Sequence, residues 1–149
     1  MLTREDDLSI SNNDLLWRRV LNNPQWVKIN ADGTFRLSSA AFLDDYTGEV
    51  SVHLEKIIKT KEEVLRGKPD QGLVEIEAGF PRLLGHKIVY DPIKDDPKLE
   101  DDLSHALICP PEISAKGRRK AAKEMALNAK WLFYPELLIR ITGERQPAT

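Results

Sequence analysis

Apolar and polar residues alternate in several short segments of this chain, and such segments predict strands with one buried face. The clearest pair is formed by residues 26–30 and 34–38, which flank an Asp-Gly pair that suits a tight turn. Further strands are expected over residues 50–54, 72–78, 87–90 and 105–109. The pattern predicts five or six short strands in a mainly antiparallel sheet.

A different spacing follows the Pro110-Pro111 pair. Apolar residues recur there every three or four positions over about residues 115–133, with Ser114 at the N-cap and Pro135 beyond the end. A sheet face needs a cover, and no other predicted helix is long enough to provide it. We therefore expect an α+β fold, with one long C-terminal amphipathic helix covering the sheet. The side chains expected to face the sheet are Met125, Trp131, Leu132 and Phe133.

The length of 149 residues is typical of one domain, which buries roughly 70% of the surface that the unfolded chain exposes. Residues 1–12 are polar, and we expect them to form a flexible leader. The regular patterns run over residues 13–141, which we interpret as a single domain without an internal repeat. Residues 142–149 are expected to be a frayed tail.

Composition favours a cytoplasmic protein with no metal site. Cys109 is the only cysteine, so it cannot form an internal disulfide, and this fits a reducing compartment. No apolar run approaches the ~20 residues that a membrane span needs, so no membrane association is expected. The three histidines do not occur at a spacing typical of metal ligands, and the residues themselves indicate no cofactor.

Charge is distributed unevenly along the chain, whose net charge is −2. Residues 1–111 carry 14 Lys+Arg and 20 Asp+Glu, whereas residues 112–149 carry 8 and 4. A pI of about 5.9 and the frequency of solvated charged faces favour a simple solvated helix. The alternative is that the helix over residues 115–133 binds nucleic acid or an acidic partner. Its binding residues would be Lys116, Arg118, Arg119, Lys120 and Lys123.

Few residues suggest a reaction. Glu75 and Glu77 share one face of a predicted strand, and two close carboxylates can perform acid–base chemistry. Alternation along a half-exposed strand explains them equally well. No nucleophile, base and orienting group can be placed together from the sequence. The residues therefore favour a non-catalytic interaction module or accessory subunit that binds another protein through an exposed patch. The expected interface anchors are Trp17 and Trp26.

One set of residues does point to an enzyme. An arginine (Arg18 or Arg19), a serine pair (Ser38 and Ser39) and a Glu-x-Glu strand (Glu75 and Glu77) follow one another along the chain. This order resembles the Arg–Ser–Glu class of NAD-dependent mono-ADP-ribosyltransferases, some of which are toxins. The resemblance implies NAD as cofactor, with the arginine holding its phosphate and ribose groups, the serine bracing the site and Glu77 stabilising the oxocarbenium. The family's Ser-Thr-Ser triplet and its mobile aromatic turn before the glutamates are missing here.

A longer resemblance covers most of residues 15–109. Its segments are Leu-Leu-Trp-Arg-Arg-Val at 15–20, Phe-Arg-Leu-Ser-Ser-Ala-Ala-Phe at 35–42, Ser-Val at 51–52, Ala-Gly at 78–79, Leu-Gly at 84–85, Asp-Pro at 91–92 and His-Ala-Leu-Ile at 105–108. The series is similar to a group of small bacterial proteins of unassigned function. The resemblance implies a bacterial protein with this layout, and it carries over no catalytic residues.

Overall fold

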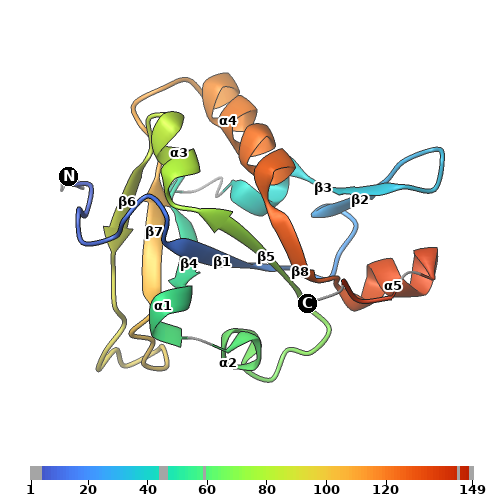
Figure 1. The fold of residues 1–149 in the computed structure, drawn as a ribbon, viewed down its shortest axis with the longest axis horizontal. Coiled ribbons are helices and arrows are strands. Elements are labelled where there is room, and N and C mark those ends of the chain that lie inside the picture. Colours follow the sequence, from blue (N-terminus) through green and yellow to red (C-terminus); the bar gives the residue numbers. More distant parts are fainter. Residues whose placement is uncertain (1–4, 44–46, 59, 144, 148–149) are drawn as a thin grey trace.

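The computed structural model describes residues 5–43, 47–58, 60–143 and 145–147. Its centre is a six-stranded sheet in which every neighbouring pair is antiparallel (Figure 1). From edge to edge the strands are β6 (Lys87–Tyr90), β7 (His105–Cys109), β4 (Val50–Leu54), β1 (Leu15–Val20), β5 (Gly72–Glu77) and β8 (Lys130–Phe133). The prediction of an α+β fold with a mainly antiparallel sheet is confirmed.

One face of the sheet is closed by α4 (Ala115–Asn128) together with the 3-10 turn η1 (Ser39–Phe42), and Figure 1 shows α4 lying above the sheet. The period-two alternation of the strands points Leu16, Val52 and Ile76 at this layer, and each is at most 2% exposed. The facing elements contribute the buried side chains Phe42, Ala122, Met125 and Ala126. The main hydrophobic core therefore lies between the sheet and α4.

The helix that the sequence predicts over residues 115–133 ends earlier than expected. Ala129 has extended backbone angles, φ −66° and ψ 141°, and the next residues form β8 beside β5. Aromatic residues suit a strand, where Trp131 packs against the main core and Leu132 joins a cluster on the opposite face. The apolar run satisfied helical spacing, but pairing with the sheet edge decides its conformation.

The second face of the sheet is covered in part. α1 (Glu55–Ile58) and α2 (Lys61–Leu65) lie below it in Figure 1. Their buried residues form a smaller cluster with side chains from the strands, and its members are Trp17, Ile58, Val64, Leu73 and Leu132. Trp17 is only 5% exposed and its indole Nε1 donates to Glu75 Oε1 at 3.0 Å. The expected interface anchor is therefore a core residue.

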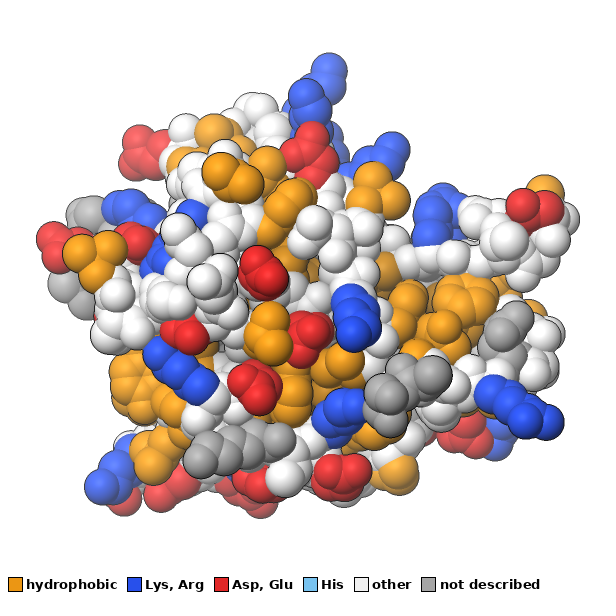
Figure 2. Space-filling view, viewed as in Figure 1, with side chains coloured by type: hydrophobic (Ala, Val, Ile, Leu, Met, Phe, Trp, Pro, Cys, Tyr) orange, Lys and Arg blue, Asp and Glu red, His pale blue; other side chains and the backbone are white. Residues whose placement is uncertain are grey.

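A separate hairpin, β2 (Val27–Ile29) with β3 (Phe35–Leu37), projects from the body beside α5 (Glu136–Thr142). The hairpin is the one that the Asp-Gly pair predicts, and Gly33 takes the left-handed φ of 87° that its turn needs. Apolar side chains line a hollow of about 310 Å³ between the hairpin and α5, seen at the right of Figure 2. The sequence leaves residues 137–141 open between a strand and a helical turn, and in the structure they are part of α5.

The described part of the leader packs against the domain. Ile10 is 1% exposed in the main core, and Asp6 Oδ1 accepts a hydrogen bond from Arg82 Nε at 3.0 Å. The backbone N–H of Asp7 also donates to the carbonyl of Ile88 at 2.8 Å. The packed domain therefore starts before residue 13, and residues 1–4 lie outside the described residues. In the tail, Gln146 Nε2 donates to the carbonyl of Tyr134 at 3.0 Å.

The short helix α3 (Gly79–Leu83) lies at one end of the sheet near β6 and α4 (Figure 1). Across the described residues, no helix is both long and apolar enough to cross a membrane. The fold thus has one fully covered sheet face and one face that is open where α1 and α2 do not reach.

Replacing Met125 by alanine tests how α4 is attached. Met125 is 1% exposed against the sheet, so Met125→Ala should lower the free energy of unfolding by about 2–5 kcal/mol in urea titrations. Leu127→Ala on the same helix is the matched control, because Leu127 is 69% exposed and its loss should cost less than about 0.5 kcal/mol. Equal losses for the two variants would contradict the packing of α4.

Candidate active site

The open part of the second sheet face carries a row of polar side chains on β4 and β7. Alternation along β4 puts Val50 and Val52 in the core and Ser51 and His53 on the other face. The β4–β7 register places His53 directly opposite His105 and Ser51 opposite Leu107. Ser51 is therefore the diagonal neighbour of His105, a relation that lets side chains on one sheet face meet.

His105 on β7 has hydrogen-bond partners on both sides, namely Ser51 on β4 and Asp91 directly after β6. Its Nε2 lies 3.1 Å from Ser51 Oγ on β4. Its Nδ1 lies 2.8 Å from the backbone oxygen and 3.2 Å from the carboxylate Oδ2 of Asp91, the residue after β6. The backbone N–H of Asp91 donates to the carbonyl of His105 at 3.0 Å, which holds the two residues side by side. Ser51, His105 and Asp91 thus form a connected chain of hydrogen bonds.

The partners of His105 determine which of its nitrogens carries the proton. A backbone carbonyl only accepts, so the close contact to Asp91 O assigns the proton to Nδ1. Nε2 then carries the lone pair that accepts the hydroxyl proton of Ser51. The Ser51 side chain is exposed, so a reactant can reach its oxygen. A serine hydroxyl beside an oriented imidazole nitrogen is the arrangement that nucleophilic catalysis requires.

The second histidine of the cross-strand pair has its own serine and aspartate, but they are buried. His53 Nδ1 lies 2.9 Å from Asp102 Oδ2, and Ser104 Oγ donates to Asp102 Oδ1 at 2.5 Å. Ser104 is 2% exposed and its hydroxyl proton goes to the carboxylate. This second network therefore holds the structure together and offers no accessible nucleophile.

Burial sets the protonation of this second network. Desolvation is the main reason why the pKa of His53 falls to about 4; the charge of Asp102 opposes the decrease and the positive charge of Arg19 adds to it. Burial raises the pKa of Asp102, but the hydrogen bonds from Ser104 and the charge of His53 outweigh it and leave that pKa below its usual value. At neutral pH His53 is uncharged and Asp102 is ionised.

A cleft of about 310 Å³ opens over both histidines. Its outer wall is the acidic loop between β6 and β7, which is folded back by a bridge between Ile93 and Asp102. Arg66, the residue after α2, is bonded to this loop: its Nη1 donates to the carbonyl of Asp101 at 3.1 Å. The lining consists of Arg19, Ser51, His53, Arg66, Ile93, Leu99, Glu100, Asp102 and His105. The volume suits a small ligand.

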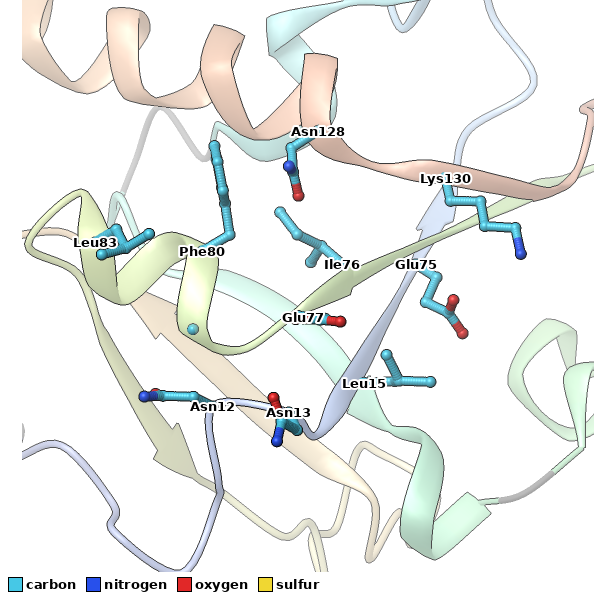
Figure 3. Close-up of a pocket in the computed structure, with 11 residues that line it drawn as sticks. Asn12, Asn13, Leu15, Glu75, Ile76, Glu77, Phe80, Leu83, Asn128 and Lys130 are labelled. Carbon is cyan, nitrogen blue, oxygen red and sulfur yellow. The ribbon is translucent and has the colours of Figure 1, made fainter.

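The glutamates that the sequence singles out lie elsewhere. Glu75 and Glu77 are on β5, on the face opposite the buried Val74 and Ile76, as alternation predicts. Figure 3 shows both beside an open cleft of about 590 Å³ with Lys130 on the neighbouring strand. None of the arginines or serines of the ADP-ribosyltransferase resemblance lines this cleft.

Arg18, Arg19 and Ser38 lie outside the cleft that Glu75 and Glu77 line. Arg18 Nε donates to the carbonyl of Ala41 at 2.9 Å, and its guanidinium lies 5.1 Å from the ring centre of the half-buried Trp26. Ser38 caps η1, where its hydroxyl accepts from the N–H of Ala40 at 3.2 Å. Arg19 alone lines the histidine cleft. The structure thus places Arg18 and Ser38 at η1, Arg19 in the histidine cleft and the two glutamates in a third place.

The basic residues of α4 lie on the opposite side of the sheet from the histidine cleft. Most are exposed, and Arg118 is half-buried beside Gly48. They border a shallow hollow of about 580 Å³ with Ser39 and Ser114. Its basic members are Lys116, Arg119, Lys120 and Lys123. Within the described residues, no group of three or more His, Cys, Asp or Glu is arranged to hold a metal ion.

Comparison of the chain with protein-family models, with curated proteins and with solved structures finds no match. The assignment of a site therefore rests on the geometry of the residues themselves.

Sequence reasoning missed the residues around His105 because they come from three separate segments. The Ser-x-His pattern on one strand did place Ser51 and His53 on a common face. The sequence does not show that β7 is the strand beside β4, nor the register of the two strands that brings His105 to Ser51.

The low pKa of His53 makes stability depend on pH. Unfolded His53 binds a proton near its ordinary pKa of 6.5, whereas the folded residue binds one only near about 4. Between these pH values the unfolded state holds the extra proton, so the free energy of unfolding should fall as the pH falls, by up to ~3 kcal/mol, and then level off with respect to this group.

Urea unfolding of wild type and His53→Gln at several pH values between about 7 and about 4 checks this expectation. His86, whose pKa burial also lowers, contributes to both proteins and cancels in the difference. The variant should lose less stability on acidification than the wild type. Parallel curves would show that His53 is not the group responsible.

Proposed function

We propose that the chain is a serine-dependent hydrolase that cleaves small esters in the histidine cleft. The observation that carries this proposal is the connected set of Ser51, His105 and Asp91, with 3.1 Å between nucleophile and base and 3.2 Å between base and carboxylate. Ser51 is the nucleophile, His105 the general base and Asp91 the group that orients the imidazole. Of the two serines that lie beside a histidine nitrogen in this part of the described structure, Ser51 is exposed and Ser104 is buried.

The reaction proceeds in two balanced steps. Ser51 Oγ bonds to the ester carbonyl carbon while its proton moves to His105 Nε2, and the alkoxide then leaves with that proton as the C–O bond breaks. The product is an acyl-serine and a free alcohol. Water attacks the acyl-serine after giving a proton to Nε2, and return of this proton to Ser51 releases the carboxylic acid. Asp91 stabilises the imidazolium that forms in each step.

The backbone of Ser51 is held by a side chain from the neighbouring strand. The paired register of β1 and β4 covers only two residue pairs, Leu16 with Leu54 and Trp17 with His53. Beyond these pairs, Arg18 Nη1 donates to the carbonyl of Ser51 at 2.8 Å. The nucleophile thus sits at a fixed position on a strand, which is the precision that a catalytic group needs.

A fluorophosphonate probe tests the nucleophile without knowledge of the natural substrate, because it phosphonylates serines that a neighbouring base has activated. We expect labelling of the wild type at Ser51, identified by peptide mass spectrometry. Ser51→Ala should abolish labelling, and His105→Gln should slow it by on the order of 10²-fold or more.

Ser104→Ala is the matched control, since Ser104 is also close to a histidine and an aspartate but donates its proton to Asp102. This variant should still be labelled at Ser51 if it remains folded by circular dichroism. Labelling of Ser104 in the wild type, or none at any serine, would contradict the proposal.

A second function is favoured by the exposed basic side chains of α4. We propose that this helix binds the phosphate backbone of nucleic acid. Lys and Arg side chains project from the end of the molecule that α4 forms (Figure 2). Glu124 is the single acidic residue in α4, so little within the helix offsets the positive charge. A phosphate backbone matches a row of spaced cations, and its binding releases counterions.

Titration of a short DNA duplex at two salt concentrations tests this surface. We expect binding at low salt that weakens as salt rises, and the double variant Lys120→Glu/Lys123→Glu should reduce the slope of log K against log salt by about 2. Lys68→Glu/Lys98→Glu is the control, because it makes the same charge change at exposed residues away from α4. If the duplex does not bind at low salt, the proposal that α4 binds nucleic acid is wrong. Binding of an acidic protein under the same conditions would then assign the basic surface to a protein partner.

A further inference from the structure

Among the described residues, no acidic group pairs with Arg19, a cation that lines the histidine cleft. Within the described residues, Asp102 is engaged by His53 and lies 3.8 Å from Arg66, and Glu100 pairs with Arg66 at 3.4 Å. Asp91 pairs with His105. In the same part of the chain, Arg19 forms neither an ion pair nor a hydrogen bond, although it lines the cleft.

The surroundings of Arg19 favour binding of an anion. Arg19 is half-buried on β1, and its partner across the β1–β5 ladder is the fully buried Leu73. Trp17, two residues earlier on the same face of β1, belongs to the apolar cluster with Leu73. An arginine side chain that packs beside apolar residues is partly desolvated. Its guanidinium therefore attracts an anion more strongly than it would on an open surface.

We infer that the ester cleaved at Ser51 carries a carboxylate or phosphate group, and that Arg19 binds this group. This inference rests on the proposed hydrolase function. A guanidinium presents paired N–H donors that match the two oxygens of such an anion. Arg19 therefore determines specificity, while Ser51 and His105 perform the chemistry.

The spacing of the strands limits the size of the substrate. Arg19 is on β1 and Ser51 on the adjacent β4, and neighbouring strands lie about 5 Å apart. Both side chains line the same cleft of about 310 Å³, so the anionic group and the ester carbon belong to one small molecule. Ile93 and Leu99 on the acidic loop supply an apolar wall of the cleft for the rest of the molecule. A small aryl or alkyl ester with one negative charge meets these requirements.

A matched pair of substrates tests the role of Arg19. The anionic 3-acetoxybenzoate and the uncharged 3-acetoxybenzamide share the acetyl group and nearly the same shape. We expect Arg19→Gln to lower kcat/KM for the anionic ester by about tenfold or more, mainly through KM, and to change kcat/KM for the amide-bearing ester by less than about twofold. Arg19→Lys should recover part of the loss, because it restores the charge without the paired donors.

Arg36→Gln is the control for loss of one positive charge, since Arg36 is exposed on the hairpin and bonds Asn30. It should leave the kcat/KM of both esters unchanged. An equal loss of kcat/KM for the two esters in Arg19→Gln would overturn the inference, because Arg19 would then stabilise the transition state or the fold and not a substrate anion.

A binding measurement separates this inference from the hydrolase proposal. Benzoate is titrated into Ser51→Ala, which retains Arg19 but has no nucleophile, and the imidazole proton signals of His53 and His105 are followed by NMR. Saturable shifts in Ser51→Ala that disappear in Ser51→Ala/Arg19→Gln are expected. If they are absent while the wild type still hydrolyses esters through Ser51, the inference fails and the hydrolase stands. If benzoate binds but no Ser51-dependent turnover of either ester occurs, the hydrolase proposal fails, and the substrate assignment fails with it.

Discussion

The pairing of β4 with β7 is the constraint on which the rest of the structure depends. This antiparallel register puts Val52 opposite Ala106 in the core and His53 opposite His105 on the other face. A shift by one residue would turn every side chain of the strand to the wrong face, so burial of the apolar set fixes the polar set as well. The contact between Ser51 and His105 is therefore a consequence of core packing.

The two faces of the sheet divide the tasks of stability and chemistry. α4 and η1 close one face over a continuous core, whereas α1 and α2 close only part of the other. Where the helices do not reach, the acidic loop between β6 and β7 forms the outer wall of the histidine cleft. Asp102 in this loop lies close to Arg66, the residue after α2. The buried polar groups there are stabilised by hydrogen bonds, as in the bonds of His53 to Asp102 and of Ser104 to Asp102. Within the part of the chain that the structure describes, the half-buried Arg19 is the exception among the charged residues of the cleft.

Local patterns in the sequence anticipated much of the fold and little of the site. Alternation predicted the hairpin of β2 and β3 and the strand β4, and Ser114 capped the predicted helix, because neighbouring residues decide these features. Long-range pairing decided the others. The segment after Asn128 joined the sheet as β8, and Trp17 entered the second cluster. The order Arg18, Ser38 and Glu77 along the chain did not become one site, since Arg18 and Ser38 lie at η1 whereas Glu77 lines a cleft that neither of them borders.

The sequence by itself determined the fold class and the face of each strand to which a side chain points, because both follow from the spacing of apolar residues over a few positions. It also determined that Ser51 and His53 would share a face. Only the tertiary structure decided which strands became neighbours and in which register. That choice depends on how all the apolar faces pack at once, and it alone brought Ser51, Asp91 and His105 from three separate segments into one row of hydrogen bonds.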